Sequence, residues 1–280
     1  MTKYAASISV SDFRGRLAEI LEEVEAGSRY SLTVKGRTVA ELLPPSTPSA
    51  VATRLLKVVR DMRRITPAQL AEAVGMRLGA LDSYMTGEND PDGKVLEALA
   101  ERFHLNAAWL KFGKGVPYKT LSLEFWDAEL FDYLQRLAPT RITCLMEDPR
   151  TQIKDPERFH GYATILLGWD DMTYMAASST LHVSTANGAG GYGRLQSFAA
   201  LCRRLSTEKT CAVYGSIIPQ ADLLALTNGE LWGGVVARSG PPSNWWDDFW
   251  DITHRFPIAT SYESNYGKAF VDAQRALRQM

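Results

Sequence analysis

Residues 66–115, TPAQLAEAVGMRLGALDSYMTGENDPDGKVLEALAERFHLNAAWLKFGKG, are the stretch of this 280-residue chain that specifies its fold most strongly. Thr66 followed by Pro67 is a helix cap with proline at the first helical position, and Gly75 ends that helix. The apolar residues spaced along one buried face of this helix are Leu70, Ala71 and Val74. Two short helices joined at a glycine, with a small alanine where they cross, predict a helix-turn-helix.

Further amphipathic helices flank this pair, so the sequence predicts an all-helical domain over residues 51–118. The helix that precedes the pair has one apolar face and one basic face with a single acid, Asp61. The basic residues of that face are Arg54, Lys57, Arg60, Arg63 and Arg64. The apolar positions of this helix and of the helices after the glycine are Leu55, Leu56, Val59, Met62, Leu81, Tyr84, Leu96, Leu99, Ala100, Phe103, Ala108, Trp109 and Leu110. Their spacing is typical of helices with one buried side.

The same stretch resembles the lambda-repressor/Cro-like (Xre) helix-turn-helix family over nearly its whole length. The segments in register are Leu-Ala-Glu-Ala-Val-Gly at 70–75, Tyr-x-x-Gly at 84–87, Pro91, and Asn-Ala-Ala-Trp-Leu at 106–110. In that family the helix after the turn enters the major groove of DNA. The resemblance therefore implies that double-stranded operator DNA is a partner of this chain.

The positions of that helix that would face the bases are Arg77, Gly79, Ala80, Asp82 and Ser83. Arg77 and Ser83 are conventional base contacts, whereas glycine and alanine offer no hydrogen bonds and Asp82 would repel phosphates. Arg60, Arg63 and Arg64 of the basic first helix are expected to contact backbone phosphates. The alternative is a degenerate module that is retained for packing or dimerisation.

Residues 1–45 predict a small unit of one helix and a β-hairpin. Ser9 or Ser11 can cap a helix that begins near Asp12. The apolar face of this helix consists of Phe13, Leu17, Ile20, Leu21 and Val24, and Gly27 follows as a stop. Residues 30–34 and 38–42, joined by Lys35-Gly36, predict two strands. So few residues cannot build a self-sufficient core, and we expect this unit to dimerise or to dock.

The segments ISVSDFRGRLAEILEEVEAG and SLTVKGRTVAELLPP, between Ile8 and Pro45, resemble the N-terminal domain of the prevent-host-death (Phd/YefM-type) antitoxins. Members of that family dimerise through this fold and bind operator DNA with the basic start of the helix and the preceding strand. The resemblance implies a DNA contact by Arg14, where the family motif has arginine, with Ser11 and Arg16 as weaker candidates. Helix N-terminal amides and guanidinium groups suit phosphate, and solvated surface arginines are the alternative.

In that family a disordered, toxin-wrapping tail follows the dimerisation domain. Here Pro44-Pro45-Ser46-Thr47-Pro48-Ser49 is a short, stiff linker that leads into a folded module. The chain departs from the family at this point, so neutralisation of a toxin by the usual tail is not expected.

Residues 119–280 predict one compact α+β domain. Helices are expected at 121–137, 194–205, 220–226, 242–255 and 268–279, and strands at 141–145, 162–169, 173–177, 180–184, 211–218 and 231–237. Its 15 basic minus 18 acidic residues give a formal charge of −3, so it is not an obvious DNA-binding domain. The whole chain is therefore expected to be α+β and multidomain: an α/β dimerisation unit, a helical domain and this domain.

Three features of the C-terminal domain have both a functional and a structural interpretation. Residues 188–193 match G-x-G-x-x-G between a possible strand and a helix, but a loop is favoured over a nucleotide site. Trp246, Phe249 and Trp250 share one helix face, which indicates core packing or a partner or ligand pocket. The remaining candidates are His160, His182 and His254, with Asp170 and Asp171. They lack metal-ligand or triad spacing, so no metal or cofactor is expected and an enzyme is disfavoured.

Composition limits the remaining choices. The formal net charge is −1, so any nucleic-acid contact must come from a local basic face. Cys144, Cys202 and Cys211 form no CxxC pair, and an odd, sparse set favours a reducing compartment. Met1-Thr2-Lys3-Tyr4 lacks the apolar stretch of a signal peptide, and no apolar run approaches the ~20 residues that span a bilayer. We therefore expect a cytoplasmic protein without a membrane partner.

The sequence predicts a transcriptional autorepressor of antitoxin type. Its first module would dimerise and bind DNA, its second would add a DNA contact, and its third would sense a ligand or bind a toxin. The alternative is a fused effector, whose C-terminal domain is an enzyme or toxin restrained by the antitoxin-like modules. Expression of residues 119–280 alone, with growth arrest as the readout, would distinguish the two.

Overall fold

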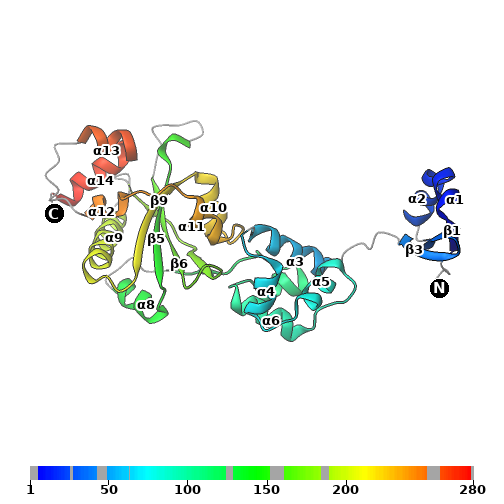
Figure 1. Ribbon diagram of the computed structural model, residues 1–280. Coiled ribbons are helices and arrows are strands. Elements are labelled where there is room, and N and C mark those ends of the chain that lie inside the picture. Colours follow the sequence, from blue (N-terminus) through cyan, green and yellow to red (C-terminus); the bar gives the residue numbers. More distant parts are fainter. Residues whose placement is uncertain are drawn as a thin grey trace.

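The structure is a computed structural model, and it describes residues 6–25, 28–42, 49–62, 64–123, 129–151, 161–183, 189–250 and 259–278. Three units follow one another along the chain (Figure 1): a small α/β unit, an all-helical unit and a unit built on one mixed sheet. This combination of helix and sheet, with a helical second unit, agrees with the α+β class expected from the sequence.

The N-terminal unit is a three-stranded sheet with two short helices. Its elements are β1 (Ala6–Ser9), α1 (Val10–Gly15), α2 (Leu17–Glu25), β2 (Tyr30–Val34) and β3 (Arg37–Leu42). The central strand β2 is parallel to β1 and antiparallel to β3. Ser9, rather than Ser11, caps α1, because its hydroxyl accepts the Asp12 amide at 3.1 Å. The single helix that was expected here is interrupted at Arg16, where φ is −124°.

The hairpin and the small core of this unit follow the sequence pattern. Lys35 and Gly36 have φ values of 49° and 76°, the left-handed pair that favours a two-residue hairpin turn. The buried core consists of Ile8, Ile20, Val24 and Leu32. Other large apolar side chains stay exposed, namely Leu17, Leu21, Val34 and Val39. The stop predicted at Gly27 and the linker residues 44–48 lie outside the described residues.

The second unit contains five helices among the described residues. They are α3 (Ala50–Asp61), α4 (Pro67–Ala73), α5 (Leu78–Thr86), α6 (Gly93–Arg102) and α7 (Ala107–Phe112). Thr66 and Gln69 form a reciprocal capping box at the start of α4, as the Thr-Pro signal predicts. The buried core includes Leu55, Met62, Leu70, Ala71, Leu81, Leu96, Leu99, Phe103 and Leu110. The helical period read from the sequence is therefore confirmed.

The third unit is a mixed sheet between helices. Its elements are β4 (Thr120–Leu121), α8 (Glu129–Leu137), β5 (Arg141–Glu147), β6 (Tyr162–Gly168), β7 (Tyr174–Ala177), β8 (Leu181–His182), α9 (Ala189–Glu208), β9 (Ala212–Ile218), α10 (Gln220–Thr227), α11 (Gly233–Ser239), α12 (Trp245–Trp250), α13 (Ala259–Tyr266) and α14 (Lys268–Arg278), with a 3₁₀ turn at Pro149–Thr151. The strand order is β4-β7-β6-β5-β9, and β8 also pairs with β6. Strands β5, β6 and β7 form an antiparallel meander, and β9 pairs parallel to β5 after α9.

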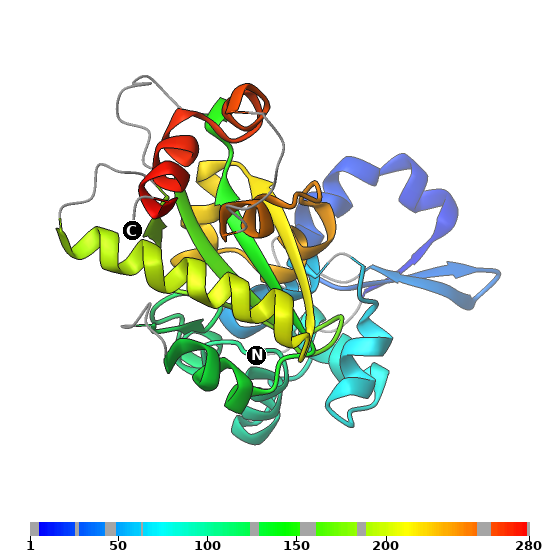
Figure 2. The ribbon, with the colours of Figure 1, turned by 90° about the vertical axis from the view of Figure 1, so that its left-hand side faces the viewer.

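The two faces of this sheet have different covers. Helices α8, α9, α12 and α14 pack on one face, and Figure 2 shows α9 and α14 in front of the strands. Helices α10 and α11 cover the other face, whose apolar cluster continues through Tyr118 into the core of the helical unit. Leu145, Leu166 and Trp232 belong to that same cluster. The boundary expected between residues 118 and 119 therefore runs through a shared core.

Several predictions for the third unit are wrong in detail. Residues 231–237 were expected as a strand, but Gly233–Ser239 is helix α11, and its N-cap residue Trp232 and its Val236 are buried in the cluster beneath it. A short apolar run lacks the length needed to separate a strand from a buried helix. Of the helix expected at 121–137, Glu129–Leu137 is observed, Leu121 instead pairs with β7, and residues 124–128 lie outside the described residues. Helix α13 was not anticipated.

The glycine motif at residues 188–193 also differs from its favoured interpretation. Gly188 lies outside the described residues, and residues 189–193 form the first turns of α9 rather than a loop. Helical backbone at these positions differs from the loop of a phosphate-binding turn, in which the glycines precede the helix.

Candidate nucleic-acid interface

Helices α4 and α5 form the helix-turn-helix, and α5 is the helix that the family resemblance assigns to the major groove. Leu81 is buried at 2% exposure and holds α5 against the core. Arg77 lies at the N-cap of α5 and makes no capping hydrogen bond, so its exposed side chain projects from the helix start. Leu78, Gly79 and Asp82 are exposed on the same helix.

The exposed surface of α5 offers few hydrogen-bond donors. The hydroxyl of Ser83 donates to the carbonyl of Ala80 at 2.8 Å, so its proton is already used within the helix. A Cβ atom added at Gly79 would meet nothing within 4 Å, which shows open space at that position. Of the two conventional base contacts expected from the sequence, only Arg77 has an unengaged donor group among the described residues.

The basic face of α3 divides into structural and solvent-facing residues. Arg54 donates to the carbonyl of Leu110 at 2.9 Å and to that of Lys111 at 3.0 Å, and so caps the end of α7. Lys57 pairs with Asp61 at 2.6 Å. Arg54 therefore stabilises the helical unit, and Lys57 is paired within its own helix while its side chain stays 42% exposed.

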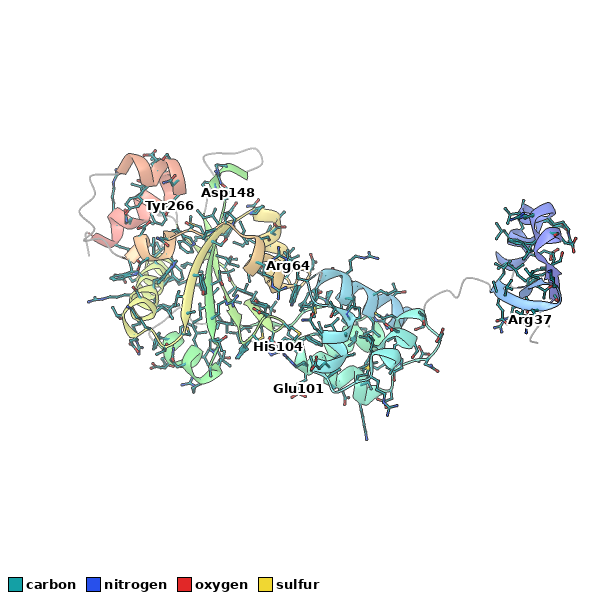
Figure 3. All side chains as sticks on the ribbon, viewed as in Figure 1. Arg37, Arg64, Glu101, His104, Asp148 and Tyr266 are labelled. Carbon is teal, nitrogen blue, oxygen red and sulfur yellow. The ribbon has the colours of Figure 1, made fainter. Side chains whose placement is uncertain are left out.

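Two further basic residues face solvent: Arg60 on α3, and Arg64, which follows the end of α3 at Asp61. Arg60 and Arg64 are exposed, and Figure 3 shows Arg64 at the junction with the third unit. Arg63 lies outside the described residues. The structure thus leaves Arg60 and Arg64 accessible for phosphate, while the DNA contact itself stays a prediction.

Acidic residues follow α5 directly. Glu88, Asp90 and Asp92 are exposed, and Asp92 accepts the Val95 amide at 2.8 Å as the cap of α6. This capping role accounts for the presence of an acidic residue at position 92. Glu88 and Asp90 place negative charge beside the α5 surface, which weakens its attraction for a phosphate backbone.

The candidate residues of the N-terminal unit do not form one cluster. Arg14 is exposed and has no ion pair or hydrogen bond among the described residues. Arg16 makes two hydrogen bonds to Glu19, at 2.8 and 2.7 Å, and this contact raises the pKa of Arg16 and lowers that of Glu19. Ser11 and Arg16 line an open hollow of about 680 Å³ beside β1, together with Ser7, Ser9 and Tyr30.

The tryptophan cluster expected as core or partner pocket packs mainly inward. Trp245 is fully buried, stacks on Phe198 at 5.8 Å and donates to the carbonyl of Cys144 at 3.1 Å. Phe249 is fully buried and Trp246 is 8% exposed. Trp250 is half-buried and donates to Asp247 at 3.0 Å. These positions agree with the core interpretation, and a partner contact by Trp250 stays a prediction.

Polar contacts join the helical unit to the third unit. Arg102, at the end of α6, pairs with Asp170 at 2.8 Å and donates to the Thr173 hydroxyl, which itself donates to the Arg102 carbonyl at 3.2 Å. Tyr118 donates to Asp61 at 2.6 Å. No local pattern in the sequence predicts these contacts, because their partners are 57 to 71 residues apart along the chain.

Comparisons with known proteins support one part of this assignment. A helix-turn-helix family model matches residues 56–110, from α3 to α7, which confirms the helix-turn-helix expected from the sequence. The match indicates a DNA-binding regulator of transcription. Searches of curated proteins and of solved structures gave no match. None of the described helices is long and apolar enough to cross a membrane, and the described residues contain no metal-ligating cluster of histidine, cysteine, aspartate or glutamate.

Proposed function

We propose that this protein is a homodimeric transcriptional repressor of antitoxin type, which binds operator DNA in the promoter of its own operon. The helix-turn-helix match over residues 56–110 supports DNA binding most directly. The antitoxin type rests on the resemblance of residues 8–45 to prevent-host-death antitoxins. A cognate toxin would bind the third unit, because the toxin-wrapping tail of that family is missing here.

The apolar surface of the first unit supports the homodimer. Leu17 and Leu21 of α2 are 46% and 43% exposed, and Val34 and Val39 of the hairpin are 45% and 58% exposed. Burial of apolar surface stabilises by ~25 cal/mol per Å², so a second copy would supply the cover that this small unit lacks. A two-fold dimer would also present two α5 helices to two operator half-sites.

The two DNA-binding modules would have different roles in affinity and in operator selection. Helix α5 has one free conventional donor, at Arg77, and acidic neighbours. The helix-turn-helix would therefore add mainly sequence-independent affinity through Arg60 and Arg64, while the N-terminal dimer, through Arg14, selects the operator. Tethering two weak modules raises the combined affinity through effective concentration.

The substitution Gly79→Glu tests DNA binding by α5. The added side chain has open space, and glutamate favours helix over glycine by up to ~1 kcal/mol, so the fold is preserved. The new carboxylate would enter the major groove, where the negative potential of the DNA would repel it and reduce affinity. Fluorescence anisotropy with the upstream promoter fragment and a random fragment measures the effect.

The matched control is Gly193→Glu, which adds the same charge on α9, where a Cβ atom also meets nothing within 4 Å. We expect Gly79→Glu to weaken binding to both fragments and Gly193→Glu to leave it unchanged. Equal affinities for the two variants would remove α5 from the interface.

A further inference from the structure

A pocket of about 260 Å³ lies between the edge of the sheet and α11, outside the proposed DNA-binding surface. Its lining includes Arg141, Thr143, Tyr214, Ser216, Val236 and Pro242. The volume is below the ~300–1,000 Å³ of most ligand sites, so the pocket suits a small metabolite rather than a nucleotide or a peptide.

The pairing of β5 with β9 builds the floor of this pocket. Their parallel register sets Thr143 beside Tyr214 and Leu145 beside Ser216, so alternate side chains of both strands point to the α11 face. The chain then crosses the edge of the sheet at Pro242, which bridges to Ser216. Ser216 donates to the carbonyl of Pro241 at 2.9 Å, which fixes this wall.

Two polar groups of the pocket, the Arg141 guanidinium and the Thr143 hydroxyl, are donors that make few contacts within the protein. The side chain of Arg141 is 32% exposed, and its contacts are long: 3.4 Å to the Tyr174 hydroxyl and 3.6 Å to Asp171. Asp171 is 80% exposed, so this ion pair is screened by solvent. Thr143 is 5% exposed, and its hydroxyl has no hydrogen-bond partner within the part of the chain that the structure describes. A half-buried guanidinium and the hydroxyl of a buried threonine are a donor pair for an anion.

The walls of the pocket add apolar surface beside this anion site. Val236 and Ala237 of α11 and the Tyr214 ring line the pocket, and the Arg141 guanidinium lies 5.7 Å from the centre of that ring. We propose that the pocket binds a small carboxylate with an apolar body, and that its occupancy alters DNA binding. The carboxylate would accept from Arg141 and Thr143, and the apolar part would lie against α11.

The route to the helical unit is a single turn between β6 and β7. Arg141 of β5 and Arg238 of α11 contact Asp171 on one side of this turn. On the other side Asp170 pairs with Arg102 of α6 at 2.8 Å. A bound carboxylate would compete with Asp171 for Arg141 and so act on the turn whose other acid, Asp170, holds Arg102 of α6. This coupling rests on the proposed function as a DNA-binding regulator, whereas ligand binding does not.

Isothermal titration calorimetry of the full chain tests the pocket, with benzoate and butyrate as probes, benzamide as the uncharged analogue and inorganic phosphate as the competing anion. We expect saturable millimolar binding of at least one carboxylate and none of benzamide. Arg141→Gln should weaken it roughly 10- to 100-fold and Thr143→Val roughly 2- to 10-fold, from the loss of a charged and a neutral hydrogen bond. Arg203→Gln, an exposed cation on α9, should bind as the parent protein does.

Three outcomes overturn the assignment of the ligand: no saturable binding of either carboxylate, binding of phosphate alone, or carboxylate binding unchanged in both pocket variants. Circular dichroism verifies that each variant is folded, and Thr143→Val keeps the side-chain volume if Arg141→Gln does not fold.

The coupling is measured separately, as DNA affinity with and without the carboxylate that binds. We expect the carboxylate to change the affinity of the parent protein for DNA. It should leave the affinity of Arg102→Gln unchanged, although that variant keeps the pocket intact. A ligand that binds without any effect on DNA affinity overturns the coupling. A chain that binds the carboxylate but no DNA contradicts the proposed function and leaves the ligand site established.

Discussion

The structure gives Arg54 a role that its sequence pattern does not predict, and Arg54→Ala tests it. Arg54 belongs to the basic face of α3, yet its guanidinium makes two hydrogen bonds to the last carbonyls of α7. These carbonyls have no partner within their own helix, and a cation at the C-terminus also interacts favourably with the helix dipole. Loss of Arg54 should therefore destabilise the helical unit rather than weaken its contact with DNA.

The size of the effect follows from the two bonds. A hydrogen bond to a charged group contributes ~1.5–3 kcal/mol when it is well buried. Arg54 is half-buried, so we take about 2 kcal/mol for the pair of bonds. The helical and third units share one core. A body of roughly 150–250 residues loses ~2–4 °C per kcal/mol, so the loss lowers the melting temperature by roughly 4–8 °C.

Urea unfolding and a DNA titration at two salt concentrations are the two measurements. Arg60→Ala is the matched control, because Arg60 is an exposed arginine of the same helix. It should leave stability unchanged and reduce the salt slope of DNA binding by about one unit. Arg54→Ala with parental stability and weakened DNA binding would refute the capping role.

Four further predictions address other parts of the chain. Arg14→Ala should weaken operator binding and lower its salt slope by about one unit, and an unchanged slope would exclude a phosphate contact. Leu21→Glu should convert the proposed dimer to a monomer in sedimentation, with parental mass as the contrary result. Burial, and secondarily Lys119, lowers the pKa of His104 below 6.5. The stability that depends on its neutral form is therefore complete above pH 6.5 and declines as pH falls below it. His104→Asn, a residue suited to the φ of 50° at this position, should flatten that decline of the unfolding free energy in urea. Gly215→Ala should cost about 1–3 kcal/mol, because its Cβ would lie 2.1 Å from the Ser243 carbonyl oxygen, and parental stability would contradict this.

A shared core between the second and third units affects how the fused-effector alternative can be tested. Residues 119–280 expressed alone would expose the apolar cluster that Tyr118 and the helical unit cover. Growth arrest by such a fragment could then result from aggregation as well as from toxin activity. A fragment that begins at Ser49 keeps the cluster covered and is the better form for that experiment.

The helical unit was predictable because its signals are local. The cap at Thr66, the period of apolar residues and the glycine turn depend on neighbours along the chain, and the structure shows each of them. The same holds for the hairpin at Lys35-Gly36, where two successive left-handed residues determine the turn. Periodicity also located most strands of the third unit, since each buries apolar residues in the central sheet.

Only the tertiary structure decided which charged side chains are free and which are engaged. Arg54 and Arg60 look alike in the sequence, but one meets the end of a helix 56 residues away and the other faces solvent. Packing on the sheet likewise determines that α11 is a helix, because an apolar run of that length suits a strand or a buried helix equally. The pocket at Arg141 depends on the parallel return of β9 beside β5 and on the crossing at Pro242. Such contacts join residues far apart in sequence, and no local propensity encodes them.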